Sequence, residues 1–418
     1  MNLASTPDVL SQHASEASFL WELRAAAVAA PHYSLADLAK LDQRVEAHLD
    51  GLRIAGEAGW EICKEALSAE APGEVFAASV LAFESGNPDR LETVLATGAA
   101  SQDLSRGLVS ALGWLPFQQA EPHIRQLLAS SQLALRRVGM AASAIHRQNP
   151  GQSLVDAVSN ADPLLRARAL RAIGELGLRS YTHEIKLHLA DPDALCHFWA
   201  AWSAALLSAD SKALAILGSI AESDLPYREK SLQAAIRRMD APAASAWHNK
   251  LAQDAQSIRI AIIAAGAFGD PASIPWLMEQ MKVPELARVA GEAFAMITGV
   301  DIALEDLDAE KPEGFEAGPT ENPGDDNVEM DPDENLPWPG SELIAKWWTQ
   351  RQAEFQKGTR YLLGKPISVD WCQQVLRNGR QRQRAAAALE LAIRQPGQPL
   401  FNVASPGFRQ QRLLGVRR

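Results

Sequence analysis

The chain has 418 residues, of which 47% are hydrophobic and 22% charged, and its formal net charge is −11. This length is too great for one compact core, so it predicts several units or a repeat array. The apolar runs are too short for a bilayer span, no secretory signal is visible, and the three cysteines are far apart, which argues against a disulfide framework or a CxxC metal site. A cytoplasmic protein with reduced thiols is expected.

Residues 1–70 are predicted to be helical. They contain "HASEASFLWELR", "YSLADLAKLDQRVEAHLDGLRIAG" and "GWEICKEAL", which have helical composition but lack the turn that recurs further along the chain. Terminal units of repeat arrays are commonly atypical because they cover the open end of the core. We therefore expect an N-terminal helical cap.

Residues 71–300 repeat a pattern with a period of about 30 residues. Each copy has a turn, a marker position a few residues later and an apolar helix, and a second helix lies between successive copies. The marker positions are Phe76, Arg106, Arg136, Arg166, Cys196, Arg228, Arg259 and Arg288. Two helices per period are typical of an α-solenoid, in which stacked neighbours bury a continuous core. The pattern, with Asp162-Pro163 and Asp191-Pro192 at helix starts, looks like HEAT-like repeats and predicts an all-α solenoid of about eight helix pairs.

The recurrence of arginine at the marker position favours a structural role. Arginine stands at six of the eight marker positions, and a catalytic residue has no reason to recur in this way. We expect these six arginines to bridge adjacent repeats. Arg168 and Arg171, which accompany Arg166 on one predicted helix, are expected to be solvated or to bind backbone carbonyls.

Residues 301–340 break the period and form a predicted acidic, Pro/Gly-rich linker. The segment has 14 acidic residues and one basic residue, and no apolar stripe. Charge repulsion and the lack of core-forming residues predict an extended, partly disordered chain. It is interpreted as a solubilising linker or, alternatively, as an acidic strap or decoy for a basic partner. The tryptophan of "LPWP", Trp338, is expected to pin the linker to the solenoid or to the C-terminal unit.

Residues 341–418 are predicted to form a small C-terminal helical unit. They carry 14 basic and four acidic residues. If they form one continuous helix, Arg377, Arg380 and Arg384 fall on one face. Contact with the acidic linker or the acidic solenoid is favoured over a nucleic-acid patch.

The sequence contains no persuasive catalytic constellation. Walker, GxGxxG, GxSxG and HExxH motifs are absent, and His183 and His188 are spaced too widely for a helical metal pair. Cys196, beside His197, has the most reactive surroundings, but it replaces a marker arginine and is interpreted as a packing residue. We therefore expect no enzyme activity, no cofactor and no metal.

The charge distribution indicates the class of partner. Nucleic-acid binding by such a solenoid requires a basic inner face, and residues 1–300 are net acidic, with 33 acidic and 25 basic side chains. A basic protein is a better charge match.

Segments at both ends of the chain carry a family resemblance. "HASEASFLW", "LDQRVEAHLDGLRIAG", "LPWP", "WW" and "GTRYLLGKPISVDWCQQVLRNGRQRQRAAAALELAIRQPGQPLF" resemble a bacterial HEAT-like-repeat family associated with type VI secretion. The C-terminal block is the most specific. A member of this family from Pseudomonas is similar to an immunity protein for a toxin with a restriction-endonuclease-like nuclease domain. The resemblance implies an immunity function and carries over no catalytic residues.

The leading hypothesis is an immunity protein that binds a cognate nuclease toxin and occludes its active or oligomerisation surface. The alternatives are an effector-loading adaptor or chaperone of the secretion system and, less favoured, a HEAT-like lyase or glycosylase. We expect a monomer that binds neither nucleic acid nor membrane directly. An acidic concave face of the solenoid is an equal candidate for the toxin-binding site. The candidate toxin-binding residues in the linker are Asp325, Asp326, Glu329, Asp331, Asp333, Glu334 and Trp338.

Overall fold

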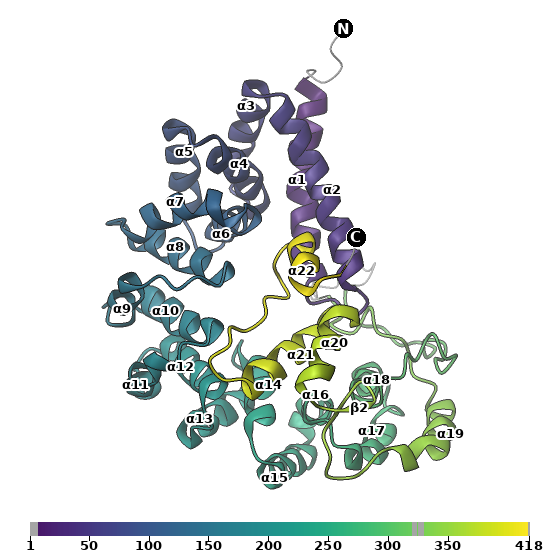
Figure 1. Ribbon diagram of the computed structural model, residues 1–418. Helices are drawn as coiled ribbons and strands as arrows, with labels where there is room; N and C mark the ends of the chain where they lie inside the picture. The colour runs from purple at the N-terminus through teal and green to yellow at the C-terminus, as the bar shows by residue number, and fades with distance from the viewer. Residues whose placement is uncertain (1–6, 320–323, 325–329, 417–418) are drawn as a thin grey trace. The chain divides into compact units, whose positions relative to one another are not determined.

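The computed structural model describes residues 7–319, 324 and 330–416, and their secondary structure is almost wholly helical (Figure 1). Within these residues the strands are limited to β1 (Tyr361–Leu362) and β2 (Lys365–Pro366), which pair antiparallel. The predicted all-α repeat fold is confirmed. No helix of the described chain combines the length and apolarity needed to cross a bilayer.

Contacts along the chain define two compact units. Unit 1 comprises Met1–Leu207, Arg377–Gln381 and Gln395–Arg418, and unit 2 comprises Ser208–Leu376 and Arg382–Arg394. Residues 341–418, expected as a small helical unit of their own, contribute to both of these units.

Unit 1 begins with long antiparallel helices and continues as stacked helix pairs. Helices α4, α6, α8, α10 and α12 pack on one another in that order, and α5, α7, α9 and α11 lie between them in sequence. Its helices are α1 (Pro7–Ala27), α2 (Leu35–Ile54), α3 (Glu57–Ala66), α4 (Pro72–Ser85), α5 (Pro88–Ala99), α6 (Leu104–Trp114), α7 (Phe117–Leu128), α8 (Leu133–Ile145), α9 (Gln152–Val158), α10 (Pro163–Leu176), α11 (Thr182–Leu187), α12 (Ala194–Leu207) and α22 (Gly407–Leu414), with 3-10 turns at Leu67–Ala69, Arg179–Tyr181 and His188–Ala190.

Unit 2 continues the same pairing. Helix α14 packs on α16 and α16 on α18, with α13, α15 and α17 as their partners. Its helices are α13 (Ser211–Ala221), α14 (Arg228–Arg238), α15 (Ala241–Ala252), α16 (Ile258–Phe268), α17 (Ile274–Gln280), α18 (Pro284–Thr298) and α19 (Ser341–Arg351), with 3-10 turns at Ala255–Ser257, Pro271–Ser273 and Gln352–Glu354. Most of α20 (Val369–Asn378) and of α21 (Gln381–Arg394) also belongs to unit 2. Helix α20 ends at Asn378 and α21 begins at Gln381. One continuous helix therefore does not carry Arg377, Arg380 and Arg384.

The repeat read from the sequence matches the stacked helices. Each of the eight marker positions falls within the first five residues of α4, α6, α8, α10, α12, α14, α16 or α18. Local chemistry explains the boundaries of α10. The side chain of Asp162 accepts a hydrogen bond from the backbone N–H of Leu165 at 2.7 Å, Pro163 occupies the first turn, and Gly177 ends the helix with φ of 68°.

The apolar core follows the stacked helices in each unit. In unit 1, buried residues of all helices from α1 to α8 form one cluster that includes Leu20, Val45, Phe76 and Leu112. In unit 2, a second cluster joins α16, α17 and α18 to Ile344 and Trp348 of α19. Burying apolar side chains of this size stabilises each by about 1.5–3 kcal/mol relative to exposure.

Irregular segments from the C-terminal part of the chain cross the ends of stacked helices. In unit 2, the N–H of Tyr361 donates to Gly269 O at 2.8 Å and the N–H of Leu363 donates to Met296 O at 2.8 Å. In unit 1, the N–H of Leu400 donates to Glu175 O at 2.9 Å. These bonds satisfy carbonyl groups at helix C-termini, which lack partners inside the helix.

Candidate functional site

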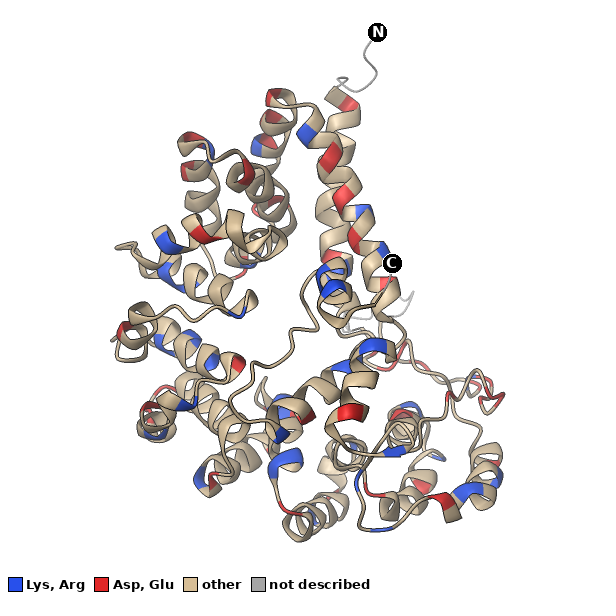
Figure 2. Ribbon diagram, in the orientation of Figure 1, with Lys and Arg blue, Asp and Glu red and all other residues tan. Residues whose placement is uncertain are grey.

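The acidic segment between α18 and α19 is folded onto unit 2 in its described residues. Figure 2 shows its acidic residues along irregular backbone. Ile302, Leu307 and Leu336 are buried, so the segment has apolar anchors. Near the two ends of the segment, the N–H of Ala309 donates to Trp338 O at 2.8 Å and the N–H of Gly340 donates to Leu307 O at 2.8 Å. The two ends of the described linker are therefore hydrogen-bonded to each other, and its buried apolar residues attach it to the repeats.

Asp331 is bound by the marker arginine of the last stacked helix. Arg288 Nη2 donates to Asp331 Oδ2 at 2.5 Å, and only 7% of the Arg288 side chain and 12% of the Asp331 side chain are exposed. Burial raises the pKa of Asp331, but the N–H of Asp333 and the charge of Arg288 outweigh it and lower the pKa below its usual value. Asp331 is therefore an anion held by the fold.

Asp333 is bound by the marker arginine one repeat earlier. Arg259 donates from Nη1 and Nη2 to the two carboxylate oxygens of Asp333 at 2.9 and 2.6 Å, a bidentate pair. The Asp333 side chain is 5% exposed, whereas 39% of the Arg259 side chain is exposed. The acidic segment thus spans two successive repeats.

Trp338 packs on the same cluster. The Arg288 guanidinium lies 4.6 Å from the Trp338 ring centroid, and Phe315 meets Trp338 edge-on at 4.9 Å. A guanidinium over an indole face gains cation–π attraction of about 0.5–2 kcal/mol. The expectation that Trp338 pins the linker to the solenoid is confirmed.

The structure brings together three of the seven candidate residues, namely Asp331, Asp333 and Trp338. Glu334 follows directly in sequence and is exposed. Asp325, Asp326 and Glu329 lie outside the described residues.

An earlier turn of the chain uses the same chemistry as Asp331. The sequence Asp-Pro-Asp occurs at 191–193 and again at 331–333. Arg166 binds Asp191 through Nε at 2.9 Å, and Asp191 Oδ1 accepts the N–H of Asp193 at 3.0 Å. At the second copy, Asp331 Oδ1 accepts the N–H of Asp333 at 2.9 Å. The first copy leads into helix α12, whereas the second leads into turns and the Pro-Trp-Pro segment, so it ends the array.

The marker arginines therefore do not share one role. Arg166 bridges to the next repeat, as expected. The same expectation is wrong for Arg259 and Arg288, because their guanidinium groups bind the acidic segment. It is also wrong for Arg106, which pairs with Asp103 of its own repeat at 2.7 Å and lies over the Trp21 ring of α1.

A cavity of about 580 Å³ lies where the acidic segment meets α16 and α18. Besides the arginine–aspartate pairs, Glu285, Glu313 and Glu316 line it, together with Phe315. The exposed rim is acidic, while Arg259 and Arg288 are neutralised by their aspartate partners. This arrangement can bind cationic side chains and offers no group for covalent chemistry.

Two large apolar side chains in the acidic segment are exposed. Leu304 is 80% exposed and Met330 is 65% exposed. They accompany exposed acids such as Glu310, Glu313 and Glu316. Contiguous exposed apolar patches are typical of protein-binding surfaces, whereas single exposed apolar residues such as these are common on any surface. No sequence pattern marks Leu304 and Met330, since single apolar residues in an acidic segment carry no periodic signal.

Cys196 has the properties of a packing residue. Its side chain is buried, and Sγ lies 3.2 Å from Pro163 O. Burial raises the pKa of the Cys196 thiol to about 12, so the thiolate needed for nucleophilic attack is scarce at neutral pH. Across the residues that the structure describes, no three His, Cys, Asp or Glu side chains are grouped to hold a metal ion.

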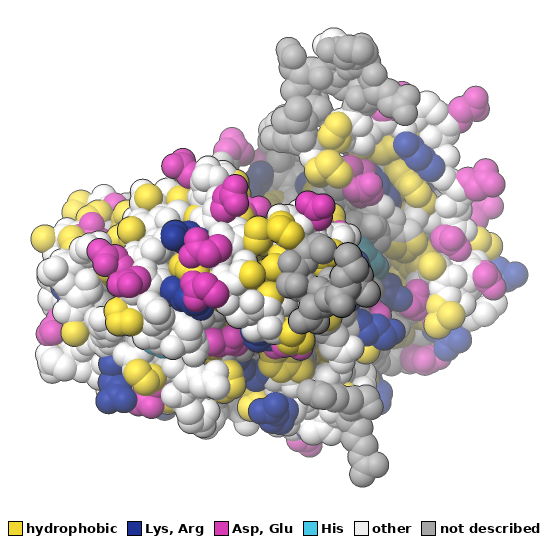
Figure 3. All heavy atoms as spheres, turned by 90° about the horizontal axis from the view of Figure 1, so that it is seen from above, with side chains coloured by type: hydrophobic (Ala, Val, Ile, Leu, Met, Phe, Trp, Pro, Cys, Tyr) yellow, Lys and Arg dark blue, Asp and Glu magenta, His cyan; other side chains and the backbone are white. Residues whose placement is uncertain are grey.

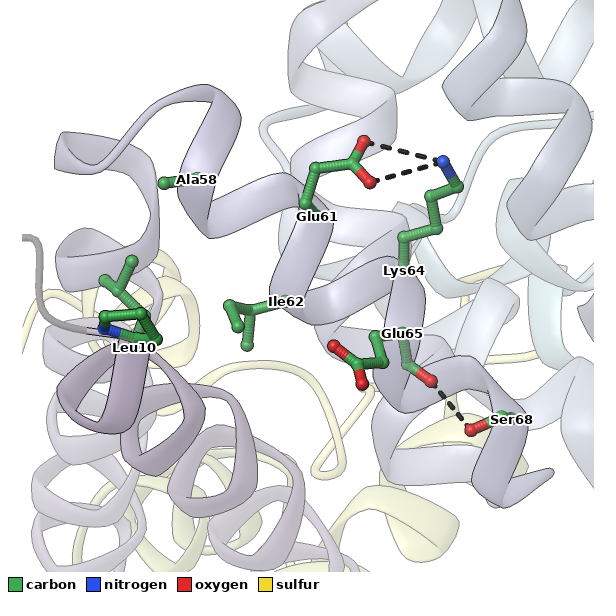
Figure 4. A pocket seen from close by; sticks show the side chains of 8 residues that line it. Leu10, Ala58, Glu61, Ile62, Lys64, Glu65 and Ser68 are labelled. Atoms are coloured by element: carbon green, nitrogen blue, oxygen red, sulfur yellow. Dashed lines mark hydrogen bonds and ion pairs between the residues drawn. The ribbon is translucent and has the colours of Figure 1, made fainter.

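A second hollow, of about 530 Å³, lies at the N-terminal end of unit 1. Figure 4 shows Leu10, Ala58 and Ile62 on its walls, with Lys64 paired to Glu61 at 3.3 Å. Figure 3 views the molecule from above and shows hydrophobic, acidic and basic side chains interspersed on that face. Of the charged side chains drawn in this hollow, Glu61 and Lys64 pair with each other, and the carboxylate of Glu65 is drawn without a partner.

The fold defines an all-α repeat protein with an acidic segment bound to its last two repeats. No protein-family model matches the chain, and no curated protein matches it significantly.

Proposed function

We propose that the protein is an immunity protein that binds a cognate nuclease toxin of a type VI secretion system and blocks it by occlusion. The observation that supports this most is the acidic segment, which is fixed to the repeats at Asp331, Asp333 and Trp338 while other acids and Leu304 remain exposed. A fixed acidic surface costs less conformational entropy on binding than an unattached tail.

The partner matches this surface by charge. A nuclease must bind phosphate groups, so its substrate surface is rich in Lys and Arg. The exposed acids Glu310, Glu313 and Glu316 attract such a surface and orient it during encounter. Leu304 then supplies apolar contact area, which charged rims do not.

The mechanism is steric and electrostatic. An acidic segment seated on the toxin's basic cleft excludes the nucleic-acid backbone from it. Because occlusion needs no bond to be made or broken, the proposal assigns no catalytic residue to this chain.

Co-expression tests the proposal. The chain is produced in a sensitive host together with the nuclease encoded by the adjacent gene. Growth rescue together with a stable stoichiometric complex supports immunity. Binding without rescue indicates an adaptor, and turnover of a substrate by the purified chain alone contradicts both binding functions.

A further inference from the structure

Unit 1 contains a cavity of about 430 Å³ whose lining is rich in arginine. Its walls come from α1, α6, α8 and α10, and its remaining wall is the segment that includes Asn402 and Ala404–Pro406. One glutamate, Glu175, accompanies the arginines. The lining arginines are Arg24, Arg106, Arg147, Arg168 and Arg171.

Three of these arginines surround the single glutamate. Arg168 Nη2 donates to Glu175 Oε2 at 2.9 Å, and Arg171 Nε donates to Oε1 at 2.8 Å. Arg147 donates from Nε to Leu400 O at 2.7 Å. Burial raises the pKa of Glu175, but the charges of Arg168, Arg171 and Arg147 lower it to about 2. The positive charge at this end of the cavity therefore exceeds what Glu175 neutralises.

A donor at this end remains unused. Arg168 Nη1 is buried and has no hydrogen-bond partner among the described residues. Leaving a buried charged donor unpaired is costly, so the Arg168 donor calls for a partner such as a water molecule or an ion. Arg171, with 41% of its side chain exposed, gives access from solvent.

Indole and aliphatic side chains line the rest of the cavity, from Trp21, Trp114, Val28 and Val109. The Arg106 guanidinium lies 5.6 Å from the Trp21 ring centroid, and the Arg24 guanidinium lies 5.7 Å from the Trp114 ring centroid. A site with indole and aliphatic walls beside guanidinium groups fits an amphipathic anion.

We propose that this cavity binds a small organic oxyanion, with its phosphate or carboxylate group held by Arg168 and Arg171 and its apolar body held by Trp21 and Trp114. Guanidinium groups bind both oxyanions in a bidentate manner. The site is independent of the toxin-binding function, because unit 1 alone supplies its walls.

Calorimetric titration of the purified full-length chain tests the site with four probes: phenyl phosphate, phenylacetate, inorganic phosphate and benzyl alcohol. We expect at least one of the two amphipathic anions to bind, and the tighter one assigns the oxyanion. Inorganic phosphate and benzyl alcohol are each expected to bind at least about tenfold more weakly, since each lacks one half of the ligand.

Arg171→Gln is expected to weaken binding of the preferred anion by about tenfold, as loss of one charged hydrogen-bond donor does. Arg106→Gln, at a lining side chain that is 51% exposed, is the second cavity variant. Arg125→Gln on α7, at a side chain that is 71% exposed, is the matched control and should bind as the unmodified chain does. Thermal melting checks that each variant is folded. Absence of binding by both amphipathic anions, or unchanged affinity in both cavity variants, overturns the proposal.

Discussion

Arg288 binds Asp331 in the same way as Arg166 binds Asp191. In each pair a marker arginine binds the first aspartate of an Asp-Pro-Asp turn. At Asp191 the turn starts another repeat, and at Asp331 it attaches the acidic segment. The same local chemistry therefore both propagates the array and ends it. Of the candidate toxin-binding residues, Asp331, Asp333 and Trp338 lie at this end of the array.

The bidentate pair of Arg259 and Asp333 should contribute measurably to stability. Asp333→Asn removes a buried carboxylate and leaves Arg259 without its partner, which we expect to lower the free energy of unfolding by about 2 kcal/mol. Hydrogen exchange should become faster across 301–319. Glu334→Gln, at the exposed neighbour, is the control and should change stability by less than about 0.5 kcal/mol. Equal effects of the two substitutions would show that Asp333 does not anchor the segment.

Gly269 should be intolerant of a side chain. It has φ of 81°, and a Cβ at this position would collide with the carbonyl oxygen of Tyr361. Gly269→Ala must therefore displace the segment that crosses α16, in addition to the left-handed backbone cost of about 1 kcal/mol. Gly86→Ala is a matched comparison, because Gly86 has φ of 63° and open space around it. Denaturant unfolding should show a clearly larger loss for Gly269→Ala, and equal losses would refute the steric explanation.

His146 should make the protein sensitive to acid. Its Nε2 lies 2.8 Å from Leu112 O, and burial lowers its pKa to about 4. Between pH 6.5 and 4 the unfolded chain binds the proton and the folded chain does not, so stability falls as pH falls through this window. The loss is about 3 kcal/mol at most. Unfolding measured at pH 7 and 4.5 should show a smaller pH dependence for His146→Gln, and an unchanged dependence would exclude His146 as its source.

The three thiols should be unreactive in the folded protein. Cys63, Cys196 and Cys372 are buried, and burial raises their pKa values to about 12, 12 and 11. A thiol reagent at pH 8 should therefore modify none of them until denaturant is added. Rapid modification of Cys196 in the native protein would revive its interpretation as a nucleophile.

The helix pairs could be predicted from the sequence because stacking imposes a periodic apolar pattern. Arg166 and its bridge to the next repeat followed from the same period. The partners of Arg259 and Arg288 did not, since they lie in a segment without periodicity. The sequence signal that identifies these partners is the second Asp-Pro-Asp, at 331–333, which comes after the last repeat. The bonds of Tyr361 and Leu400 are between backbone groups, which leave little trace in side-chain pattern.

Leu304 should contribute to partner binding and little to folding. Because its side chain is 80% exposed, Leu304→Ala is expected to leave stability unchanged and to weaken toxin binding by about tenfold. Ile54→Ala, at a residue 77% exposed in unit 1, is the control and should bind normally. Interferometry with the purified toxin measures the affinity of both variants. Normal binding by Leu304→Ala would remove this residue from the interface.

The most direct test of the central claim is the affinity of the chain for the proposed nuclease toxin at low and high salt. The variant E310K/E313K/E316K reverses three exposed acids of the segment, and E92K on α5 is the control. We expect the triple variant to lose affinity, salt dependence and nuclease inhibition together, while E92K keeps all three. Undiminished affinity and inhibition by the triple variant would contradict the claim that the acidic segment occludes the toxin.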